Sequence, residues 1–308
     1  MSRALYILQT LPVGKILRLD TSTGETQVIL DNLKTHPDGI AVDESSRRIY
    51  WTNMGRIKEQ DSLEFFQADG TVESINIDGS DQRQLVGNGL FVTGKQLVLD
   101  KENQQLYWCD REGMRVFRAN TDGSRPEVLI QAGIFPRDAH DYTRHCVGIA
   151  LNKHDNHFYW TQKGPSKGGL GRILRAPLAL PSSKSDKRIP GDIAQRDDIE
   201  VVLDHLSEPI DLEFSRDYRT LFWTDRGDDA KGGNSLNSAQ LEDGKLKNHQ
   251  VIAAGFKETI ALALDEEAGV IYVSDLSGTI YRHTLDKPGS VETIASGFGP
   301  LTGITLGE

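Results

Sequence analysis

The chain has 308 residues, of which 37% are hydrophobic and 26% are charged, and its formal net charge is −10. A chain of this length and composition can bury a sizeable core. The acidic excess would repel nucleic acid and an acidic membrane surface, so we expect neither as a partner. No apolar run approaches the ~20 residues that a membrane-spanning helix needs.

Three absences predict an intracellular, cytoplasmic protein. The first ten residues, MSRALYILQT, contain neither a long apolar segment nor a small-residue cleavage site, so they predict a strand and not a signal peptide. The two cysteines, Cys109 and Cys146, form no CxxC or other metal-type spacing. The sequence also contains no N-x-S/T glycosylation motif. We therefore predict two free thiols, which we expect to lie in different local settings.

The predicted strands follow one repeating order along the chain. Three strands come first, at 4–9, 15–20 and 26–30. Five longer units follow, each with an alternating or apolar run, an aromatic phrase and two further short runs. The aromatic phrases are RIYWTN (48–53), QLYWCD (105–110), HFYWTQ (157–162), TLFWTD (220–225) and VIYVSD (270–275). They recur about every 50 to 60 residues, which is the length of a four-stranded propeller blade.

The two ends of the chain complete one further blade. The first three strands lack an innermost strand, and the segment PLTGITLG (300–307) is an innermost strand with nothing after it. Pairing between them would close the ring and remove two exposed sheet edges. We therefore predict an all-β, six-bladed β-propeller that comprises residues 1–308 as a single domain.

The tryptophans carry a resemblance to a known family. All four lie at the same place in the aromatic phrase, where a large ring fills the wedge between tapering blades and the next polar residue satisfies backbone groups. They are Trp51, Trp108, Trp160 and Trp223. The phrase resembles the YWTD repeat of low-density-lipoprotein-receptor-type propellers over nearly the whole chain. The copies YWCD, YWTQ and YVSD depart from it, and the cysteine-rich modules that flank such propellers in receptors do not occur here.

Sequence motifs of catalysis are largely missing. The chain contains no HExxH, GxGxxG or Walker A motif. The segments NIDGSD (76–81) and NTDGSR (120–125) resemble calcium loops, but they occupy the same place in consecutive blades. That position predicts hairpin turns.

The candidate site follows from propeller geometry, because the innermost strands all enter the central funnel from one face. Aligning these strands predicts a first ring of His36, Thr93, His145, Glu208, Glu258 and Pro300, and a second ring of Asp38, Lys95, Val147, Ile210, Ile260 and Thr302. Histidines, glutamates and a lysine around one pore can transfer protons. Our candidate catalytic residues are His36, Lys95, His145, Glu208 and Glu258. Alternatively, these are solvated loop residues or caps on strand ends.

Two long loops are predicted on the funnel face. They are 131–147 and 53–66, and together they could form an apolar, partly cationic lid over the mouth. The alternative is two surface excursions. Our candidate substrate-binding residues are Asp38, Met54, Phe65, Phe66, Phe135, Tyr142 and Arg144. The polar loop 179–198 is predicted on the opposite face, without a role in chemistry.

The overall character of the chain resembles the standalone propellers of fungal natural-product pathways, which include hetero-Diels–Alderases of tropolone-sesquiterpenoid biosynthesis. That resemblance implies a small-molecule enzyme without a cofactor. It would dehydrate a hydroxymethyl tropolone or phenol to a quinone methide and then add a polyene. The first step needs acid–base groups, and the second needs two partners positioned in an apolar pocket.

Two other functions stay open. One is a binding module without catalysis, which would dock a protein as receptor propellers do. The other is a metal-dependent lactonase, because SEPIDL (207–212) resembles the Glu-x-Pro setting of gluconolactonase-type propellers. Hard cations need several oxygen ligands, yet the second ring offers Val147, Ile210 and Ile260 at those places. We therefore predict no metal site.

Overall fold

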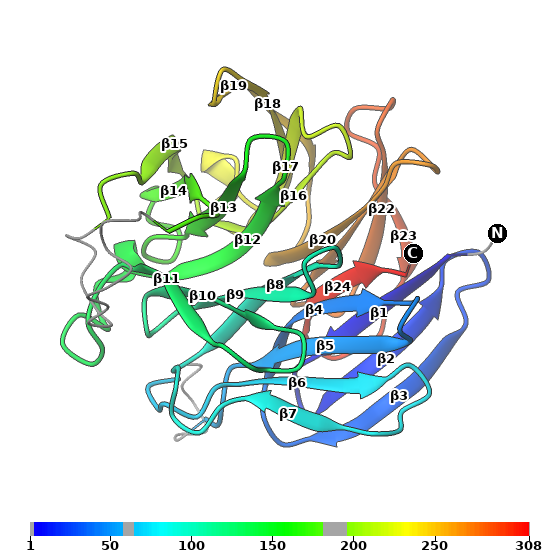
Figure 1. The fold of residues 1–308 in the computed structure, drawn as a ribbon. Coiled ribbons are helices and arrows are strands. Elements are labelled where there is room, and N and C mark those ends of the chain that lie inside the picture. Colours follow the sequence, from blue (N-terminus) through cyan, green and yellow to red (C-terminus); the bar gives the residue numbers. More distant parts are fainter. Residues whose placement is uncertain (1–2, 58–64, 181–195, 308) are drawn as a thin grey trace.

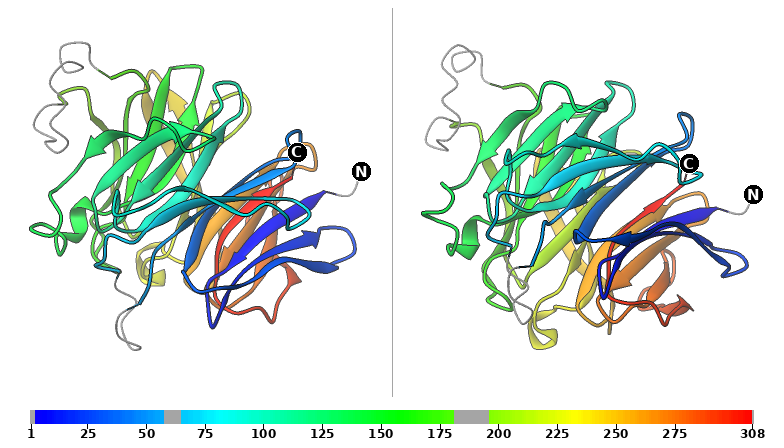
Figure 2. Two further views of the ribbon diagram at one scale, coloured as in Figure 1. Left: turned by 60° about the horizontal axis from the view of Figure 1, so that its bottom comes forward. Right: turned by 90° about the horizontal axis from the view of Figure 1, so that it is seen from below.

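The computed structural model describes residues 3–57, 65–180 and 196–307. They form six four-stranded antiparallel sheets arranged around a common axis (Figures 1 and 2). The predicted all-β, six-bladed propeller is confirmed. Within the described ranges, no helix is long and apolar enough to cross a membrane.

The blades are numbered here from the N-terminus, and their strands are given from the axis outward. Blade 1 contains β24 (Leu301–Leu306), β1 (Ala4–Gln9), β2 (Gly14–Asp20) and β3 (Thr26–Leu33). Blade 2 contains β4 (Pro37–Asp43), β5 (Arg48–Asn53), β6 (Thr71–Asn76) and β7 (Arg83–Val86). Blade 3 contains β8 (Gly94–Asp100), β9 (Gln105–Asp110), β10 (Arg115–Asn120) and β11 (Glu127–Gln131).

The second half of the ring has the same order. Blade 4 contains β12 (Cys146–Asn152), β13 (His157–Gln162), β14 (Gly171–Pro177) and β15 (Glu200–Leu206). Blade 5 contains β16 (Pro209–Phe214), β17 (Thr220–Asp225), β18 (Ser235–Glu242) and β19 (Lys245–Ala254). Blade 6 contains β20 (Thr259–Asp265), β21 (Val270–Asp275), β22 (Ile280–Thr284) and β23 (Glu292–Ala295).

The two ends of the chain meet in blade 1, as predicted. Strand β24 pairs antiparallel with β1, with Leu5 opposite Leu306 and Ile7 opposite Ile304. Figure 1 shows the red C-terminal strand β24 beside the blue strand β1. The pairing leaves β24 as the innermost strand, so closure of the ring is made by backbone hydrogen bonds.

The aromatic phrases coincide with the second strand of each blade, and their alternation explains the repeat. In β5, Tyr50 packs toward blade 3 in a cluster with Trp108, whereas Trp51 packs toward blade 1 in a cluster with Tyr6. Successive side chains of a strand point to opposite faces, so each of the four tryptophan-containing phrases contributes one aromatic residue to each of its two blade interfaces. All four tryptophans are buried, which confirms the wedge interpretation.

The residue after each tryptophan connects neighbouring blades. Thr52 Oγ1 accepts a hydrogen bond from the Gly39 backbone N–H (2.9 Å) and donates one to the Lys95 carbonyl (2.7 Å). Gly39 belongs to the inner strand of the same blade, and Lys95 to that of the next. These bonds satisfy backbone groups at the axis, where no further strand pairs with the sheet.

The cysteines are unpaired, as predicted, but they do not lie in different settings. Cys109 takes the place of the threonine in β9, and Cys146 begins β12. Both belong to the core cluster between blades 3 and 4. Burial raises the pKa of the Cys146 thiol to about 12, so this thiol stays protonated at neutral pH.

The two segments that resemble calcium loops are hairpin turns. Asp78 accepts a hydrogen bond from the backbone N–H of Ser80 (2.9 Å), and Asp122 accepts one from Ser124 (2.8 Å). Each aspartate is followed by a glycine with positive φ, as such turns require. Their carboxylates therefore stabilise the turn backbone.

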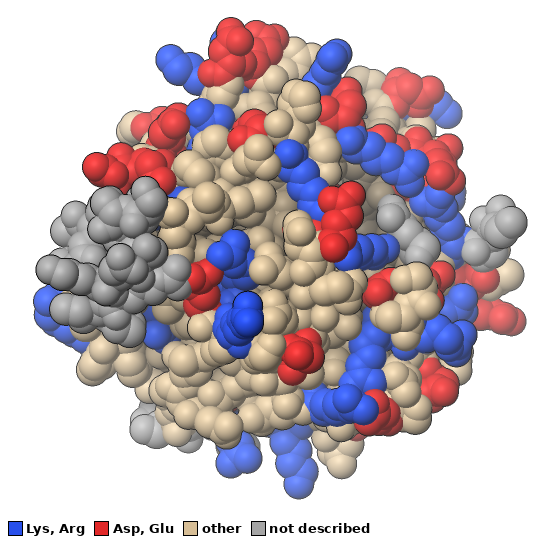
Figure 3. All heavy atoms as spheres, viewed as in Figure 1, with Lys and Arg blue, Asp and Glu red and all other residues tan. Residues whose placement is uncertain are grey.

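Charged side chains on the surface are of mixed sign. On the face drawn in Figure 3, lysine and arginine alternate with aspartate and glutamate, and no single-sign patch covers that face. Exposed ion pairs occur on the surface, such as Lys247 with Glu242 (2.9 Å). Pairs of this kind contribute little to stability.

Candidate functional site

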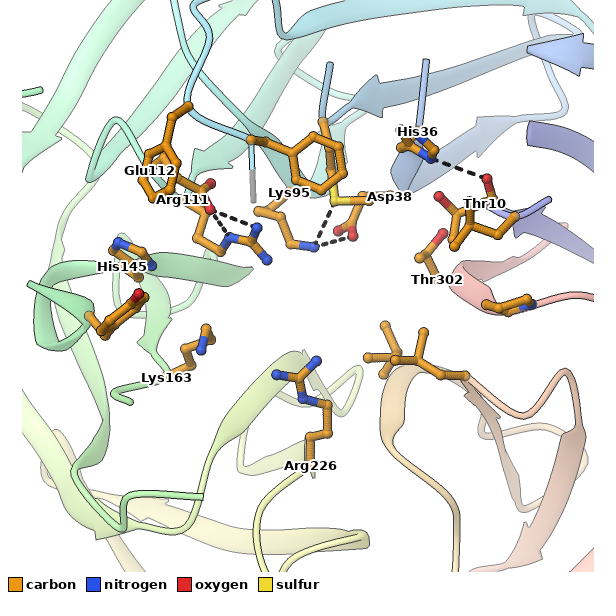
Figure 4. Close-up of a pocket in the computed structure, with 18 residues that line it drawn as sticks. Thr10, His36, Asp38, Lys95, Arg111, Glu112, His145, Lys163, Arg226 and Thr302 are labelled. Carbon is orange, nitrogen blue, oxygen red and sulfur yellow. Dashed lines mark hydrogen bonds and ion pairs between the residues drawn. The ribbon is translucent and has the colours of Figure 1, made fainter. Parts of the chain in front are cut away.

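A cavity of about 310 Å³ lies at one end of the central channel (Figure 4). Loops and strand ends from every blade contribute to its wall. The predicted site residues that line it are His36, Asp38, Met54, Phe65, Phe66, Lys95, Tyr142 and His145. The inner-strand alignment and the two long loops therefore identified a large part of this wall.

Two predicted site residues lie behind the wall and not on it. Glu208 is fully buried and forms ion pairs with Lys163 (3.2 Å) and Arg226 (2.6 Å), both of which line the cavity. Glu258 is partly exposed and pairs with Lys167 (3.1 Å). The structure therefore gives Glu208 the position of a counterion for two lining cations.

Two loop residues also lie away from the cavity. Phe135 packs against the core cluster between blades 3 and 4. Arg144 pairs with Asp141 (2.6 Å) and donates a hydrogen bond to the carbonyl of Ala132 (2.7 Å), so its guanidinium stabilises the fold of its own loop. These contacts depend on the path of the loop, which the alignment of inner strands does not specify.

The wall also contains four charged residues that the sequence reasoning missed. They are Arg111, Glu112, Lys163 and Arg226. The sequence did contain a signal for Arg111, Lys163 and Arg226. In every blade, the residue directly after the second strand lines the cavity, and in blades 2 to 6 that strand is the aromatic phrase. These six residues, one from each blade, are Thr10, Met54, Arg111, Lys163, Arg226 and Leu276.

The aspartate that ends some of these phrases explains why the next side chain reaches the cavity. Asp110 accepts hydrogen bonds from the backbone N–H of Thr93 (2.8 Å), and Asp225 accepts one from that of Glu208 (2.9 Å). Each aspartate thereby connects the end of its strand to the segment that enters the same blade's inner strand. The next residue leaves the sheet at the axis, where its side chain reaches the cavity.

Three cations from consecutive blades gather on one side of the cavity: Arg111, Lys163 and Arg226. Burial, together with the charges of Arg111 and Arg226, lowers the pKa of Lys163 to about 8 against the opposing effect of Glu208. Burial alone would raise the pKa of Glu208, but Arg226 and Lys163 outweigh it, and the pKa is lowered. Glu208 thus compensates Lys163 and Arg226, and Glu258 Oε2 also lies 3.5 Å from Arg226 Nε.

The remaining charged groups of the wall form two close ion pairs, drawn in Figure 4. The Lys95 ammonium contacts the Asp38 carboxylate and lies 3.4 Å from Met54 Sδ. The Arg111 guanidinium contacts Glu112 Oε1 through Nε (2.7 Å) and Nη2 (2.6 Å). Burial lowers the pKa of Lys95, although Asp38 opposes this shift.

The two predicted histidines are neutral in this environment. Burial lowers the pKa of His145 to about 4, and its Nε2 lies 2.8 Å from the carbonyl oxygen of Ala139. Burial also lowers the pKa of His36, whose Nδ1 lies 3.3 Å from the carbonyl oxygen of Thr10. At neutral pH His145 therefore has a neutral ring and no second proton to donate.

The two long loops meet at the mouth of the cavity. The rings of Phe66 and His140 are 4.8 Å apart between centroids, and those of Phe65 and His36 are 5.4 Å apart. Tyr142, from the 3₁₀ helix η1 (Tyr142–Arg144), lies 5.9 Å from the Lys163 ammonium. Residues 58–64 of one loop, and 181–195 of the polar loop, lie outside the described residues.

The opposite end of the channel has a different lining. Aliphatic side chains of the inner strands predominate there, together with Gln96, Asp211 and Glu213. Asp211 accepts a hydrogen bond from the backbone N–H of Leu262 (3.2 Å), and Glu213 accepts one from Leu264 (3.0 Å). Burial raises the pKa of Asp211 to about 7. Within the described ranges, no group of three His, Cys, Asp or Glu side chains could hold a metal ion.

Comparison with known proteins gives two informative relatives. A protein of Pyricularia oryzae named low-density lipoprotein receptor-related protein 1 is 39% identical over 99% of this chain and 98% of its own length. A protein of Cochliobolus heterostrophus named 3-hydroxyacyl-CoA dehydrogenase-like protein LAM1 is 37% identical over 88% of this chain. The match covers 56% of that second protein, so this chain corresponds to little more than half of it. No protein-family model matches the chain.

Among solved structures, the nidogen/laminin complex contains a chain with a TM-score of 0.70 to this protein. The two are 17% identical, and the match covers 99% of this chain and 98% of the other. At that identity the likeness concerns the fold alone.

Proposed function

The chain belongs to the family of the Pyricularia oryzae protein named low-density lipoprotein receptor-related protein 1, and we propose that it is a small-molecule enzyme of natural-product biosynthesis. In this proposal the cavity dehydrates a hydroxymethyl tropolone or phenol to a quinone methide. It then positions the quinone methide for a hetero-Diels–Alder addition to a polyene. No cofactor takes part in either step.

The division of the cavity wall supports this proposal. Blades 3 to 5 contribute the cations Arg111, Lys163 and Arg226. Blade 6 contributes Ile260 and Leu276, which are apolar. A phenolic oxygen that becomes anionic fits the cationic side, and a hydrocarbon polyene fits the apolar side. One cavity could thus hold both partners together, which is the main requirement of a cycloaddition.

The dehydration step needs balanced proton transfers. The phenol or tropolone hydroxyl loses its proton, the benzylic C–O bond breaks, and the departing oxygen takes up a proton and leaves as water. Lys163 is best suited to donate that proton, because its pKa of about 8 allows both forms near neutral pH. Lys95, whose pKa is also lowered, is the second candidate. His145, neutral and bonded to Ala139, is better suited to accept a proton than to donate one.

Product formation tests this proposal. The protein is incubated with 2-(hydroxymethyl)phenol and a polyene, and the adduct is quantified by mass spectrometry against a protein-free reaction. We expect adduct formation only with protein, and a loss of about 100-fold or more in Lys163→Met if this lysine transfers a proton. Lys247→Met, an exposed lysine of β19, is the matched control and should retain full activity.

Two outcomes would favour other functions. Binding of the phenol without any adduct would favour a ligand-binding module, and a protein partner would then be sought. Hydrolysis of a lactone that depends on an added divalent ion would favour the lactonase alternative. Against that alternative, the carboxylate of Glu208 is already paired with Lys163 and Arg226.

A further inference from the structure

Three cationic side chains at the cavity end can be reached from the cavity. Arg111, Lys163 and Arg226 line it, and their side chains are 16%, 9% and 21% exposed, respectively. In Figure 4 they extend toward the cavity from three consecutive blades. The Nη1 atoms of the two arginines are not buried and have no hydrogen-bond partner among the described residues, so each still has N–H groups to donate.

These cations lie close together. Lys163 Nζ and Arg226 Nη2 both contact Oε1 of Glu208, at 3.2 Å and 2.6 Å, so these two nitrogens are no more than 5.8 Å apart. Besides burial, the charges of Arg111 and Arg226 lower the pKa of Lys163 against the effect of Glu208. Because the interaction between charges weakens with distance, Arg111 belongs to the same group of charges.

The cations of the cavity wall outnumber the carboxylates that are buried against them. Among the described residues, the cations that line the cavity are Lys95, Arg111, Lys163 and Arg226. Their buried carboxylate partners are Asp38, Glu112 and Glu208. Glu258 also approaches Arg226 (3.5 Å), but it is 40% exposed and lies closer to Lys167 (3.1 Å). One positive charge is therefore left in excess.

Two further acids behind the wall have other partners. Asp110 pairs with Arg115 (2.8 Å). Asp225 accepts hydrogen bonds from the backbone N–H groups of Glu208 and Gly227, both at 2.9 Å. Neither carboxylate lines the cavity, so the excess positive charge belongs to the side chains that face it.

This excess favours a ligand that is anionic before any reaction. A positive charge without a counterion in a partly buried site is unfavourable, and a neutral phenol supplies no counterion. One excess charge matches a monoanion, whereas a phosphate ester carries nearly two negative charges. The planar fork of an arginine also fits the two oxygens of a carboxylate.

Aromatic rings flank two of the cations. The Phe65 ring lies 5.9 Å from Arg111 Cζ, and the Tyr142 ring lies 5.9 Å from Lys163 Nζ. A carboxylate carried on an aromatic ring would therefore have cations beside its oxygens and aromatic side chains near its ring.

We infer that Arg111, Lys163 and Arg226 bind a carboxylate of the aromatic substrate, which is then a phenolic acid and not a neutral phenol. This inference rests on the proposed function, since it concerns the same cavity, and it adds a group that the proposed reaction does not itself require. The carboxylate would hold the aromatic partner on the cationic side. The apolar side, with Ile260 and Leu276, would stay available to the polyene.

Two probes of similar shape test the inference by calorimetry at pH 7. The first is 4-hydroxy-3-(hydroxymethyl)benzoate, and the second is its methyl ester, which has no negative charge. We expect the native protein to bind the acid at least about tenfold more tightly than the ester, because only the acid forms charged hydrogen bonds to the cations. Equal affinity, or a preference for the ester, would overturn the inference.

Variants assign the preference to these side chains. Lys163→Met and Arg226→Met should each reduce the affinity ratio of acid to ester to about threefold or less. Lys247→Met, an exposed lysine of β19, should leave the ratio unchanged. Each cavity variant leaves Glu208 with one cation fewer, so melting temperatures identify a variant that does not fold, and the probe pair tests the native protein without substitution. A full ratio in both folded variants would contradict the inference.

Adduct formation with the same probes separates this inference from the proposed function. Tight binding of the acid without adduct from either probe would refute the proposed function and leave the carboxylate site standing. Adducts from both probes, with equal affinity for the two, would overturn the carboxylate site and leave the proposed function standing.

Discussion

The two ends of the central channel are built from the same inner strands, yet their polar groups are used differently. At the opposite end, Asp211 and Glu213 accept hydrogen bonds from backbone N–H groups of β20. At the cavity end, Asp38 and Glu112 instead form ion pairs with the lining cations Lys95 and Arg111. Carboxylates at the opposite end thus satisfy backbone groups of a neighbouring inner strand, and those at the cavity end compensate cations of the wall.

This difference shows why burial of a charged residue is not by itself a sign of a functional site. Asp211 is also buried in the channel, and its pKa is raised. Its bonds to the backbone explain its presence structurally, because an inner strand has unpaired N–H groups that need acceptors. The cavity acids instead have charged partners that line the cavity.

The largest expected effect comes from removing the strand that closes the ring, because both ends of the channel depend on that closure. Deleting residues 299–308 removes β24 and its pairing with β1. The inner edge of blade 1 would then be exposed, and we expect unfolding or aggregation. Size-exclusion chromatography and thermal melting measure this. A truncated protein that stays monomeric with an unchanged melting temperature would contradict the observed closure.

A smaller effect tests the charge of the cavity end alone. Lys163, with its pKa lowered to about 8, carries its positive charge below that pH and loses it as the pH rises. Binding of benzoate, an anion throughout this range, should therefore weaken by about tenfold between pH 7 and pH 9.5. Lys163→Arg should retain binding at pH 9.5, because arginine stays protonated. A native affinity that does not change with pH would show that Lys163 is not part of an anion site.

The smallest effect concerns the opposite end. Since the pKa of Asp211 is raised to about 7, the folded state favours the protonated acid, and its stabilising contribution is lost as the pH rises from about 4 through 7. Between pH 5 and pH 8, the melting temperature of Asp211→Asn should therefore fall by about 3 °C less than that of the native protein. The exposed turn variant Asp243→Asn is the control and should follow the native protein. An unchanged slope in Asp211→Asn would mean that this acid is ionised throughout.

Several site residues could be predicted because they follow the repeat. Lys95 and His145 were found by aligning inner strands, and Arg111, Lys163 and Arg226 could have been found by reading one residue beyond each aromatic phrase. Residues of the long loops could not be placed in this way, because the loops do not follow the repeat. Phe135 and Arg144 belong to the predicted loop, but the loop directs them into the core and toward its own backbone.

The sequence by itself determined the number of blades, the bounds of the aromatic strands and the closure of the ring. These properties depend on alternation within a strand and on recurrence along the chain, and both are local patterns. Only the tertiary structure decided which charges meet. Lys163 and Glu208 come from different blades and pair at the axis. Ala139 sets the tautomer of His145 through one carbonyl. Such contacts depend on how the blades converge and where each side chain points, which no local pattern encodes.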